Sequence, residues 1–401
     1  MAILLVLFTI FAQGASAPVG GDEEMKGKLI HPGSSDTFEN RKLVKEMPEA
    51  LNIRTQKLHR AGQGSGPQTT MQPRPDLGPK NNFTKPMSIT NQEIAEWMYE
   101  GDIVLTPSQA KFIVTGVNDK NTTRSKRACI TDPSEFWDPL TPIPYTFDSS
   151  ELFYRVEVEF QLGTVTHEIG HALGFFHTQS RYDRDSWVYV DLNNVPQNLQ
   201  YNFAKMTPAT ENHFGQPYDF GSVMQYDPYA FAEDPNQYTV TAINMAYQNS
   251  MGQREAPAFS DVRMMNWLYN CSSYCMGVPV PPCRQPGYQD PRNCYSCKCP
   301  RAFGGQYCEQ LADGSAPNCN GAVVQAPAGR RIQLRLSTPP SSCMQGCPWQ
   351  GIEVNLGKFD LYGMIMCCQS SQTYTSVSNL VTIRGIVRYN QLTFGLDYRV
   401  V

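Results

Sequence analysis

Apolar positions follow three different patterns along this 401-residue chain. Residues 2–12 are apolar with a single threonine among them, whereas residues 61–86 are dense in Gly, Pro, Gln and other polar residues. Near the C-terminus, short stretches at 331–336, 351–354 and 380–383 alternate or run apolar between Gly, Ser and Pro residues. The last pattern predicts the strands of a β-sandwich. The polar stretch cannot bury a core and is predicted to be a linker.

The first apolar run predicts a signal peptide over residues 1–17. It is too short to span a bilayer, and Ala15-Ser16-Ala17 supplies the small residues of a cleavage site. No later stretch is long and apolar enough for a membrane anchor, and thirteen cysteines fit an oxidising compartment. We therefore expect a secreted, extracellular glycoprotein with sequons at Asn82, Asn121 and Asn270 and no membrane partner. A net charge of -4 gives no electrostatic case for nucleic acid.

The most specific chemical motif of the chain is His-Glu-x-x-His, followed by a glycine and a third histidine. Positions i and i+4 share one face of a helix, so His167 and His171 can direct their imidazoles to one ion. A positive φ at Gly174 would end the helix and turn the chain back, which brings His177 to the same ion. Three neutral imidazoles suit Zn²⁺ and leave a position for water, beside which Glu168 can act as general base.

The length of this motif separates a catalytic site from an ordinary helix. A bare His-Glu-x-x-His also fits a surface helix, so the short form alone is weak evidence. The longer form needs the glycine and the third histidine at fixed offsets, and it contains three of the chain's six histidines. Ser222-Val223-Met224-Gln225-Tyr226 adds the methionine turn expected of metzincins, in which Met224 would pack under the histidines. A catalytic zinc site is therefore the favoured interpretation.

The residues around this motif resemble the astacin metalloproteases, a narrower match than the metzincins at large. The matching segments are His177–Asp185, Ser222–Tyr226, Ile143–Tyr145 and Pro217–Gly221. The resemblance implies an α+β metzincin (zincin-like) catalytic domain over residues 128–271 with one Zn²⁺ per chain. It also implies that Tyr226 is an additional zinc ligand, which can swing away and stabilise the tetrahedral intermediate.

Residues 18–127 are predicted to form a propeptide. Within them, Tyr99-Glu100-Gly101-Asp102 resembles the astacin motif in which an aspartate caps the zinc, although the family usually has Phe in place of Tyr99. A carboxylate in the water position would block the nucleophile, so Asp102 is the candidate latency switch and a metal ligand in the latent form only. The alternative is a Gly-Asp turn on the surface. The basic segment Arg124–Arg127 predicts cleavage by a furin-type convertase, which would leave Ala128 as the new N-terminus.

Cysteine spacing indicates two further modules. Residues 272–309 resemble a small, disulfide-rich EGF-like module, which has almost no core and is held by its disulfides. Its cysteines are Cys275, Cys283, Cys294, Cys297, Cys299 and Cys308. By resemblance, the first pairs with the third, the second with the fourth and the fifth with the sixth, while spacing alone allows fifteen pairings. Residues 319–401 resemble a short CUB domain, an all-β sandwich. This arrangement is that of many nematode astacin-like proteases.

One departure from the family concerns the start of the catalytic domain. Between the predicted cleavage site and His167 lie only residues 128–166, where family members place a long helix and most of a twisted sheet. The N-terminal half of the domain, with the edge strand that pairs with substrate, is therefore predicted to be truncated. Cysteine counting agrees, because Cys129 and Cys271 are left over from the two modules and the total is odd.

Two smaller features concern residues outside the core motif. Thr178 stands where the family usually has a glutamate that receives the new N-terminal ammonium, so this ion pair is not expected. The other histidines, His31, His59 and His213, lie in polar surroundings and are expected to be solvated. Neither feature changes the predicted metal site.

The sequence as a whole predicts a secreted zinc metalloendopeptidase made as a zymogen. Three histidines would hold the metal, with Tyr226 as accessory ligand and oxyanion stabiliser. Glu168 would take a proton from water and pass it to the leaving amine. The expected substrates are extracellular proteins, with cuticle or collagen-like matrix implied by the nematode relatives. The alternative is a catalytically impaired isoform in which only the EGF-like and CUB-like modules act, as a binding protein.

Overall fold

The computed structural model describes residues 99–103, 162–208, 210–312, 321–340, 343, 346–347, 350–387 and 392–401. The predicted signal peptide, most of the propeptide, the basic cleavage site, and His31, His59 and Cys129 lie outside these residues. The chain divides into two compact units. The first contains the described parts of Gly78–Gly215 and Pro228–Ile243, and the second contains Gln216–Asp227 and the described parts of Asn244–Val401. None of the helices in these described ranges is long and apolar enough to cross a membrane.

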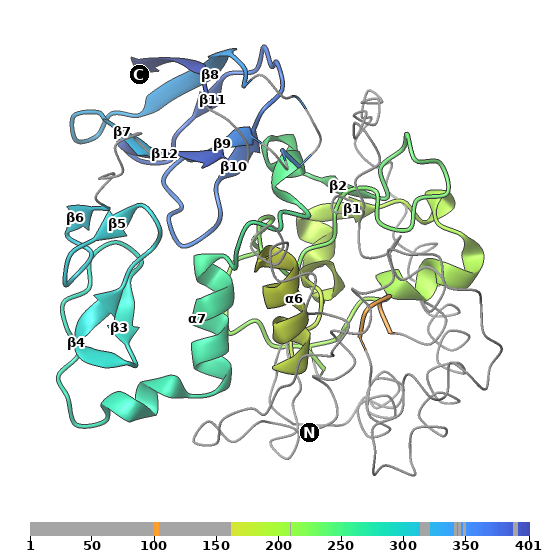
Figure 1. Cartoon of the computed structure of the whole chain (residues 1–401), viewed down its shortest axis with the longest axis horizontal. Coiled ribbons are helices and arrows are strands. Elements are labelled where there is room, and N and C mark those ends of the chain that lie inside the picture. The colour runs from red at the N-terminus through yellow and green to blue at the C-terminus, as the bar shows by residue number, and fades with distance from the viewer. Residues whose placement is uncertain are drawn as a thin grey trace, which may run out of the picture. The chain divides into compact units, whose positions relative to one another are not determined.

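Among its described residues, the first unit contains one α-helix, a two-stranded ribbon and several short 3₁₀ helices (Figure 1). Helix α6 (Leu162–Ala172) buries the first two histidines of the zinc motif together with Glu168. Strand β1 (Val188–Val190) pairs antiparallel with β2 (Val240–Ala242). The 3₁₀ helices are η6 (Thr178–Ser180), η7 (Arg184–Ser186), η8 (Leu192–Asn194) and η9 (Gln197–Phe203).

Helix α6 ends where the sequence predicted a change of chain direction. Its last residue is Ala172, and Gly174 adopts a φ of 96°, a left-handed conformation that glycine reaches at no steric cost. The N–H of Gly174 donates to the carbonyl of His171, and the N–H of Phe175 donates to that of Gly170, so these two carbonyls near the helix end are satisfied. This turn directs the following residues back along the helix.

The second unit begins with the methionine turn and helix α7 (Phe259–Leu268). The carboxylate of Asp261, in the first turn of α7, accepts hydrogen bonds from the hydroxyl of Ser222 at 2.6 Å and the N–H of Val223 at 2.9 Å. It also accepts the N–H of Ala258 at 2.8 Å. A carboxylate is favoured at a helix N-terminus by the unpaired N–H groups there. Asp261 therefore ties the beginning of the methionine turn, just before Met224, to the N-terminal end of α7.

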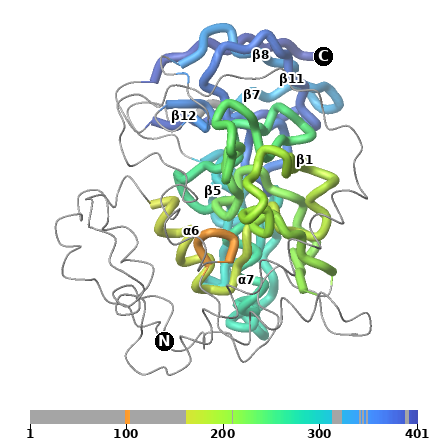
Figure 2. The backbone as a smooth tube through the Cα atoms, turned by 90° about the vertical axis from the view of Figure 1, so that its right-hand side faces the viewer, coloured from red at the N-terminus to blue at the C-terminus, as the bar shows by residue number. Residues whose placement is uncertain are grey.

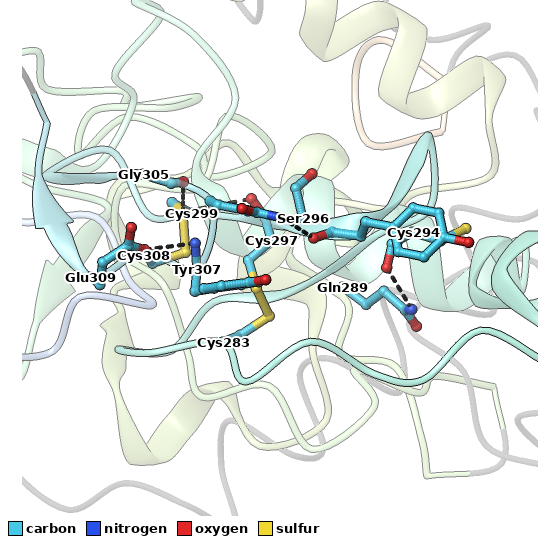
Figure 3. The surroundings of a disulfide bond; sticks show 12 residues. Cys283, Gln289, Cys294, Ser296, Cys297, Cys299, Gly305, Tyr307, Cys308 and Glu309 are labelled. Carbon is cyan, nitrogen blue, oxygen red and sulfur yellow. Dashed lines mark hydrogen bonds between the residues drawn. A yellow bond between two sulfur atoms is a disulfide. The ribbon is translucent and has the colours of Figure 1, made fainter.

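The disulfide-rich segment consists of two hairpins. One pairs β3 (Tyr288–Asp290) with β4 (Asn293–Lys298), and the other pairs β5 (Phe303–Gly304) with β6 (Gln310–Leu311). The 3₁₀ helix η11 (Cys271–Cys275) precedes them. The disulfides are Cys275–Cys294, Cys283–Cys297 and Cys299–Cys308, so the predicted pairing is confirmed. Figure 3 shows the last two of them. The apolar core of this segment contains little beyond Phe303 and the disulfides themselves.

The C-terminal region is a sandwich of two antiparallel sheets. One sheet has the strand order β10-β9-β12-β7 and the other has the order β11-β8-β13. The strands are β7 (Gly321–Gln325), β8 (Ile332–Thr338), β9 (Gln350–Asn355), β10 (Met364–Met366), β11 (Tyr374–Thr375), β12 (Leu380–Val387) and β13 (Gly395–Val400). Alternate residues of β8 face residues of β9, β10 and β12 in one core. The strands predicted at 331–336, 351–354 and 380–383 are thus confirmed. Disulfides Cys343–Cys368 and Cys347–Cys367 join segments of this region.

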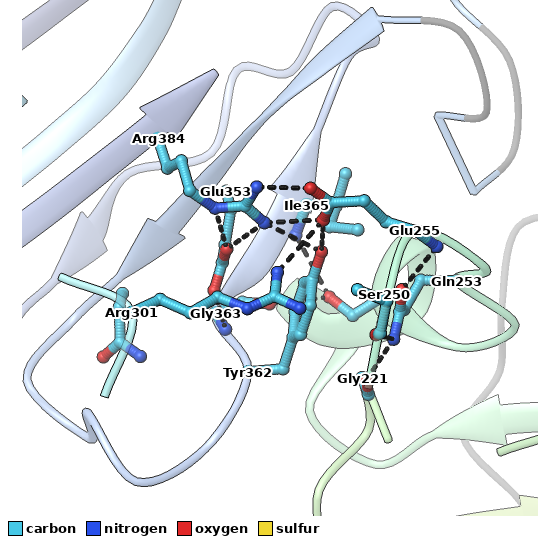
Figure 4. A network of polar contacts seen from close by, with 12 residues as sticks. Gly221, Ser250, Gln253, Glu255, Arg301, Glu353, Tyr362, Gly363, Ile365 and Arg384 are labelled. Atoms are coloured by element: carbon cyan, nitrogen blue, oxygen red, sulfur yellow. Dashed lines mark hydrogen bonds and ion pairs between the residues drawn. The ribbon is translucent and has the colours of Figure 1, made fainter. Parts of the chain in front are cut away.

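A set of charged side chains joins three segments of the second unit, and we call it the junction cluster (Figure 4). Its members come from three places. Glu255 lies just before α7, Arg301 lies in the disulfide-rich segment, and Glu353, Tyr362 and Arg384 lie in the sandwich. Arg384 donates to Glu255 at 2.5 and 2.7 Å and to Glu353 at 2.6 and 2.8 Å. Arg301 and the hydroxyl of Tyr362 donate to Glu255 at 3.1 and 2.7 Å. Burial raises the pKa of Glu255, but the hydrogen bond and charge of Arg384 outweigh it and lower the pKa to about 2.

Candidate metal centre

Four buried side chains of the first unit converge on one point. His167 and His171 come from α6, and His177 follows the turn at Gly174. Asp102 comes from the loop Tyr99–Ile103, drawn in orange beside α6 in Figure 2. Their ligand atoms all lie within 4.8 Å of one another. The structure therefore brings together all three predicted histidines and the candidate latency residue.

The spacing of these atoms fits a tetrahedral metal ion. The Nε2 atom of His167 lies 3.1 Å from that of His171 and 3.3 Å from that of His177. Oδ2 of Asp102 lies 3.1 Å from His177 Nε2 and 3.4 Å from His167 Nε2, and its Oδ1 lies 3.5 Å from His171 Nε2. A tetrahedral zinc with ligand bonds of about 2.0–2.1 Å separates its ligand atoms by about 3.3–3.4 Å.

Hydrogen bonds on the far side of two rings fix which nitrogen faces the centre. His171 Nδ1 lies 2.8 Å from the carbonyl oxygen of Phe175, and His177 Nδ1 lies 2.7 Å from Oε2 of Glu100. Both partners can only accept, so each Nδ1 carries a proton and donates it. In the neutral rings, the Nε2 lone pairs then face each other and the Asp102 carboxylate. Such an arrangement of electron pairs is stable only around a positive charge, and this donor set fits Zn²⁺.

The ionisation of the same groups also favours positive charge at this point. Burial alone raises the pKa of Asp102, but the charges of His177 and His171 and the hydrogen bonds of the imidazoles hold it well below its usual range. Burial lowers the pKa of His171 far below its ordinary value, which favours the neutral imidazole that a metal requires. For His177, burial is outweighed by Asp102 and Glu100, which raise its pKa to about 9.

The loop that carries Asp102 is a tight turn closed by two backbone hydrogen bonds. Tyr99 and Ile103 exchange N–H···O bonds of 2.9 and 3.0 Å. Gly101 has a φ of 82°, and a Cβ there would lie 2.7 Å from the ring of Phe231, so both conformation and space require glycine. Tyr99 is buried edge-on against Phe176, which holds the loop against the segment that follows α6. Asp102 is 5% exposed, so it does not lie in a surface turn.

The other predicted site residues fall in different places. Glu168 is buried on α6 beside the first histidine. Tyr226 and Met224 are buried in the second unit, and their roles at the metal stay predictions. The expectation of a solvated His213 is wrong, because its ring pairs with Glu211 at 2.9 Å and its side chain is only 13% exposed. Cys271 forms no disulfide with any described residue.

Sequence analysis missed one residue of this site, Glu100. Besides its bond to the imidazole of His177, it accepts the backbone N–H of His177 at 3.3 Å and the hydroxyl of Ser180. Its carboxylate is fully buried. Glu100 could have been suspected because it stands directly before the Gly101-Asp102 pair of the propeptide motif. Its contact with a histidine 77 positions away could not be predicted from spacing.

Three imidazoles and a carboxylate around one point, two of the imidazoles from a His-Glu-x-x-His helix, define the centre of a zinc metalloprotease. The family model Astacin (Peptidase family M12A) matches residues 152–270. Zinc metalloproteinase nas-28 of Caenorhabditis elegans is 38% identical over 489 aligned positions, which cover 99% of this chain and 96% of the relative. The chain therefore belongs to the astacin family, and it is a zinc metalloendopeptidase.

Further similarities extend over smaller parts of the chain. Zinc metalloproteinase dpy-31 of Caenorhabditis elegans is 33% identical over 65% of this chain and 53% of its own length. Among solved structures, high choriolytic enzyme 1, a hatching enzyme zinc-protease from the medaka fish Oryzias latipes, is 38% identical. That similarity covers 27% of this chain and 52% of the other, with a TM-score of 0.25.

Proposed function

We propose that this chain is a secreted zymogen whose mature form cleaves peptide bonds of extracellular proteins. The observation that carries the proposal is the insertion of Asp102, which precedes the basic segment Arg124–Arg127, among the three motif histidines. A latent metalloprotease needs a group that blocks the metal and can later be removed. The Asp102 carboxylate meets both needs, because a furin-type convertase would remove the residues that carry it. The apolar run at residues 2–12, interrupted only by Thr9, and the disulfides support secretion.

The proposed roles follow from chemistry and position. His167, His171 and His177 hold one zinc ion through their Nε2 atoms. When bound, zinc acts as a Lewis acid that polarises the scissile carbonyl and acidifies a water molecule. Glu168 takes a proton from the attacking water and delivers it to the leaving amine as the carbon–nitrogen bond breaks. The hydroxyl of Tyr226 donates a hydrogen bond to the oxygen on which negative charge develops.

Latency in this proposal is competition for one position of the site. The Asp102 carboxylate occupies the corner that water needs, and Tyr99 and Glu100 hold its loop against Phe176 and His177. Cleavage after Arg127 detaches this loop from the mature chain, which would begin at Ala128. The corner then becomes available to water and to the carbonyl of a substrate.

The C-terminal regions are proposed to be an EGF-like module at 272–309 and a CUB-like module at 319–401. Support comes from the three disulfides of the first region and the two-sheet sandwich of the second. We propose that they position the enzyme on extracellular matrix proteins such as cuticle or collagen-like material. Two of the relatives named above are zinc metalloproteinases of the nematode Caenorhabditis elegans, and the proposed substrate class is the one expected of nematode members of the family.

The decisive experiment asks whether the short segment 128–166 leaves the protease active. The alignment with nas-28 has 489 positions although this chain has 401 residues, so stretches of that relative have no counterpart here. We propose that the missing part holds the substrate extended across the metal. The chain as written should therefore cleave protein substrates much more weakly than a version with the corresponding nas-28 segment inserted, because positioning contributes roughly 7–11 kcal/mol to such reactions.

The control for this experiment is Glu168→Ala in the restored protein. It should abolish cleavage while zinc content stays at one per chain, since Glu168 is a base and not a ligand. A restored protein that is inert would contradict the proposed activity. Full activity of the chain as written would contradict the importance of the missing segment.

A further inference from the structure

The second carboxylate of the loop Tyr99–Ile103 points to a function of the propeptide beyond blocking. Glu100 precedes Asp102 by two residues, and its side chain reaches the opposite edge of the His177 ring. Oε2 of Glu100 lies 2.7 Å from Nδ1, while Oδ2 of Asp102 lies 3.1 Å from Nε2. One imidazole is therefore held between two carboxylates of the same loop.

We propose that Glu100 is a positioning residue that orients His177 for zinc, so that the latent form holds zinc more tightly than the cleaved form. The inference rests on the proposed latent state. It assigns the propeptide two opposite effects on one site, because Asp102 denies the metal to substrate while Glu100 strengthens its attachment to the protein.

The contact with Glu100 fixes the tautomer of His177. A carboxylate cannot donate, so Nδ1 must carry the proton in the contact with Glu100, and the lone pair of the neutral ring is on Nε2, toward the metal position. A carboxylate behind a metal-bound imidazole also makes the imidazole more basic and fixes the plane of its ring. Loss of such a partner typically weakens metal affinity about 10- to 100-fold.

Glu100 is itself held firmly by several hydrogen bonds. Its carboxylate is fully buried, and it accepts the backbone N–H of His177 and the hydroxyl of Ser180 in addition to the ring. Glu100 adopts a φ of 53°, an unusual value for a residue with a side chain, as part of the tight turn before Gly101. The surrounding contacts thus maintain a conformation that places this side chain behind His177.

Two of the histidines differ in whether their Nδ1 partner stays after cleavage. His171 donates its Nδ1 proton to the carbonyl of Phe175, which lies in the protease region and stays after cleavage. His177 donates its proton to a residue that precedes Arg127 and leaves with the propeptide. Activation should therefore weaken the orientation of His177 and leave that of His171 unchanged.

The test measures zinc release from full-length protein kept uncleaved by Arg127→Ala. Excess 1,10-phenanthroline is added, and zinc remaining on the protein is measured over time. Glu100→Gln keeps the size of the side chain but removes its charge, and Glu233→Gln is the matched control because Glu233 is exposed in the same unit. We expect zinc loss about 10- to 100-fold faster for Glu100→Gln and unchanged for Glu233→Gln. Cleaved wild-type protein lacks both Glu100 and Asp102, so it should lose zinc at least as fast as uncleaved Glu100→Gln.

A second measurement separates orientation of the imidazole from simple anchoring of the loop. Binding of a small hydroxamate, a bidentate zinc ligand, reports whether Asp102 still occupies its corner. Uncleaved Glu100→Gln should bind hydroxamate as poorly as the uncleaved parent does. Faster zinc loss together with new hydroxamate binding would overturn the inference, because Glu100 would then only hold the loop in place.

Other outcomes also decide the question. Equal zinc loss from cleaved and uncleaved wild-type protein would overturn the inference without use of any Glu100 variant. Uncleaved protein that binds hydroxamate as well as the cleaved form would contradict the proposed latency, and uncleaved protein without zinc would contradict the proposed metal site. Either result removes this inference too, but each is recognised by its own readout.

Discussion

Both the metal centre and the junction cluster are polar and largely removed from solvent, although the Glu255 and Arg384 side chains are each 26% exposed. Only in the junction cluster do protein atoms alone pair every charge with its opposite. In the junction cluster, the guanidinium of Arg384 donates to the carboxylates of Glu255 and Glu353, so every charge faces its opposite. In the metal centre, imidazole nitrogens and a carboxylate face one another at 3.1–3.5 Å. Donor and acceptor identity, rather than burial or the number of polar groups, therefore distinguishes a structural ion pair from a site that requires a cation.

The largest expected effect removes one ligand of the metal centre. Folded wild-type protein should contain one zinc per chain, and His171→Ala should contain almost none, because two remaining imidazoles leave the ion poorly held. His213→Ala is the matched control, since this histidine pairs with Glu211 outside the cluster and its loss should leave zinc in place. Metal analysis of purified protein provides the measurement. Retention of zinc by His171→Ala would show that the centre described here is not the metal site.

The junction cluster should respond to the loss of a charge through stability and not through zinc. Arg384→Met leaves Glu255 and Glu353 without their main partner and should lower the free energy of unfolding by roughly 1–3 kcal/mol, because these carboxylates are only partly exposed to water. The matched control is Arg335→Met in the same sandwich, whose pair with Asp397 is more than half exposed on both sides and should be worth less than about 1 kcal/mol. Denaturant unfolding distinguishes the two, and equal losses would contradict the assigned importance of the cluster.

Acid should weaken the same cluster in a defined pH window. The pKa of Glu255 falls from 4.5 to about 2 on folding, so the unfolded chain binds the proton more readily between these values. The stabilisation is complete above pH 4.5 and is lost as the pH falls toward 2, with an upper bound of roughly 3 kcal/mol. The measurement is the pH dependence of unfolding for wild type and for Glu255→Gln. If the variant shows the same acid dependence, Glu255 does not carry the effect.

The smallest expected effect concerns access to the metal in the latent form. Asp102→Ala in uncleaved protein should raise the affinity for a small hydroxamate by roughly tenfold or more, because a minor accessible population becomes the main one. Zinc content should remain near one per chain, since three imidazoles stay in place. Calorimetric titration with the hydroxamate provides both the affinity and the number of sites. Unchanged affinity would mean that Asp102 does not occupy the position of the water.

Local spacing was sufficient to predict the three histidines of the metal centre, whereas Asp102 was predicted by resemblance to a propeptide motif. His167 and His171 follow from helical periodicity, and the positive φ of Gly174 that returns His177 follows from glycine's freedom at that position. The alternation of residues in β8 predicted which face is buried. The disulfide pairing was predicted by resemblance, because spacing alone leaves fifteen possibilities. In each case the informative residues lie within a few positions of one another or match a known pattern.

The remaining features depend on contacts that no local pattern encodes. Glu255 and Arg384 are 129 positions apart, and Ser222 and Asp261 are 39 positions apart. His213 was expected to be solvated because its sequence neighbours are polar, yet Tyr182 and Glu211 cover it in the folded unit. No expectation was attached to Glu100, whose partner His177 lies 77 positions away. Polar residues are harder to place than apolar ones, since the partner that permits their burial can come from anywhere in the chain.

The junction cluster limits how this chain can exchange parts during evolution or protein engineering. Glu255 belongs to the protease region, Arg301 to the disulfide-rich segment and Arg384 to the sandwich, and Asp219 accepts the backbone N–H of Tyr362 at 3.0 Å. A chimaera that received the sandwich alone would keep the pair of Arg384 with Glu353 but lose the pair of Arg384 with Glu255. The protein that gave up the sandwich would retain Glu255 with Arg301 as its remaining cation. The smallest portable cassette therefore extends beyond the sandwich and includes the acidic residues that face it. A recombination boundary placed between Glu255 and Arg301 would separate groups that fold together.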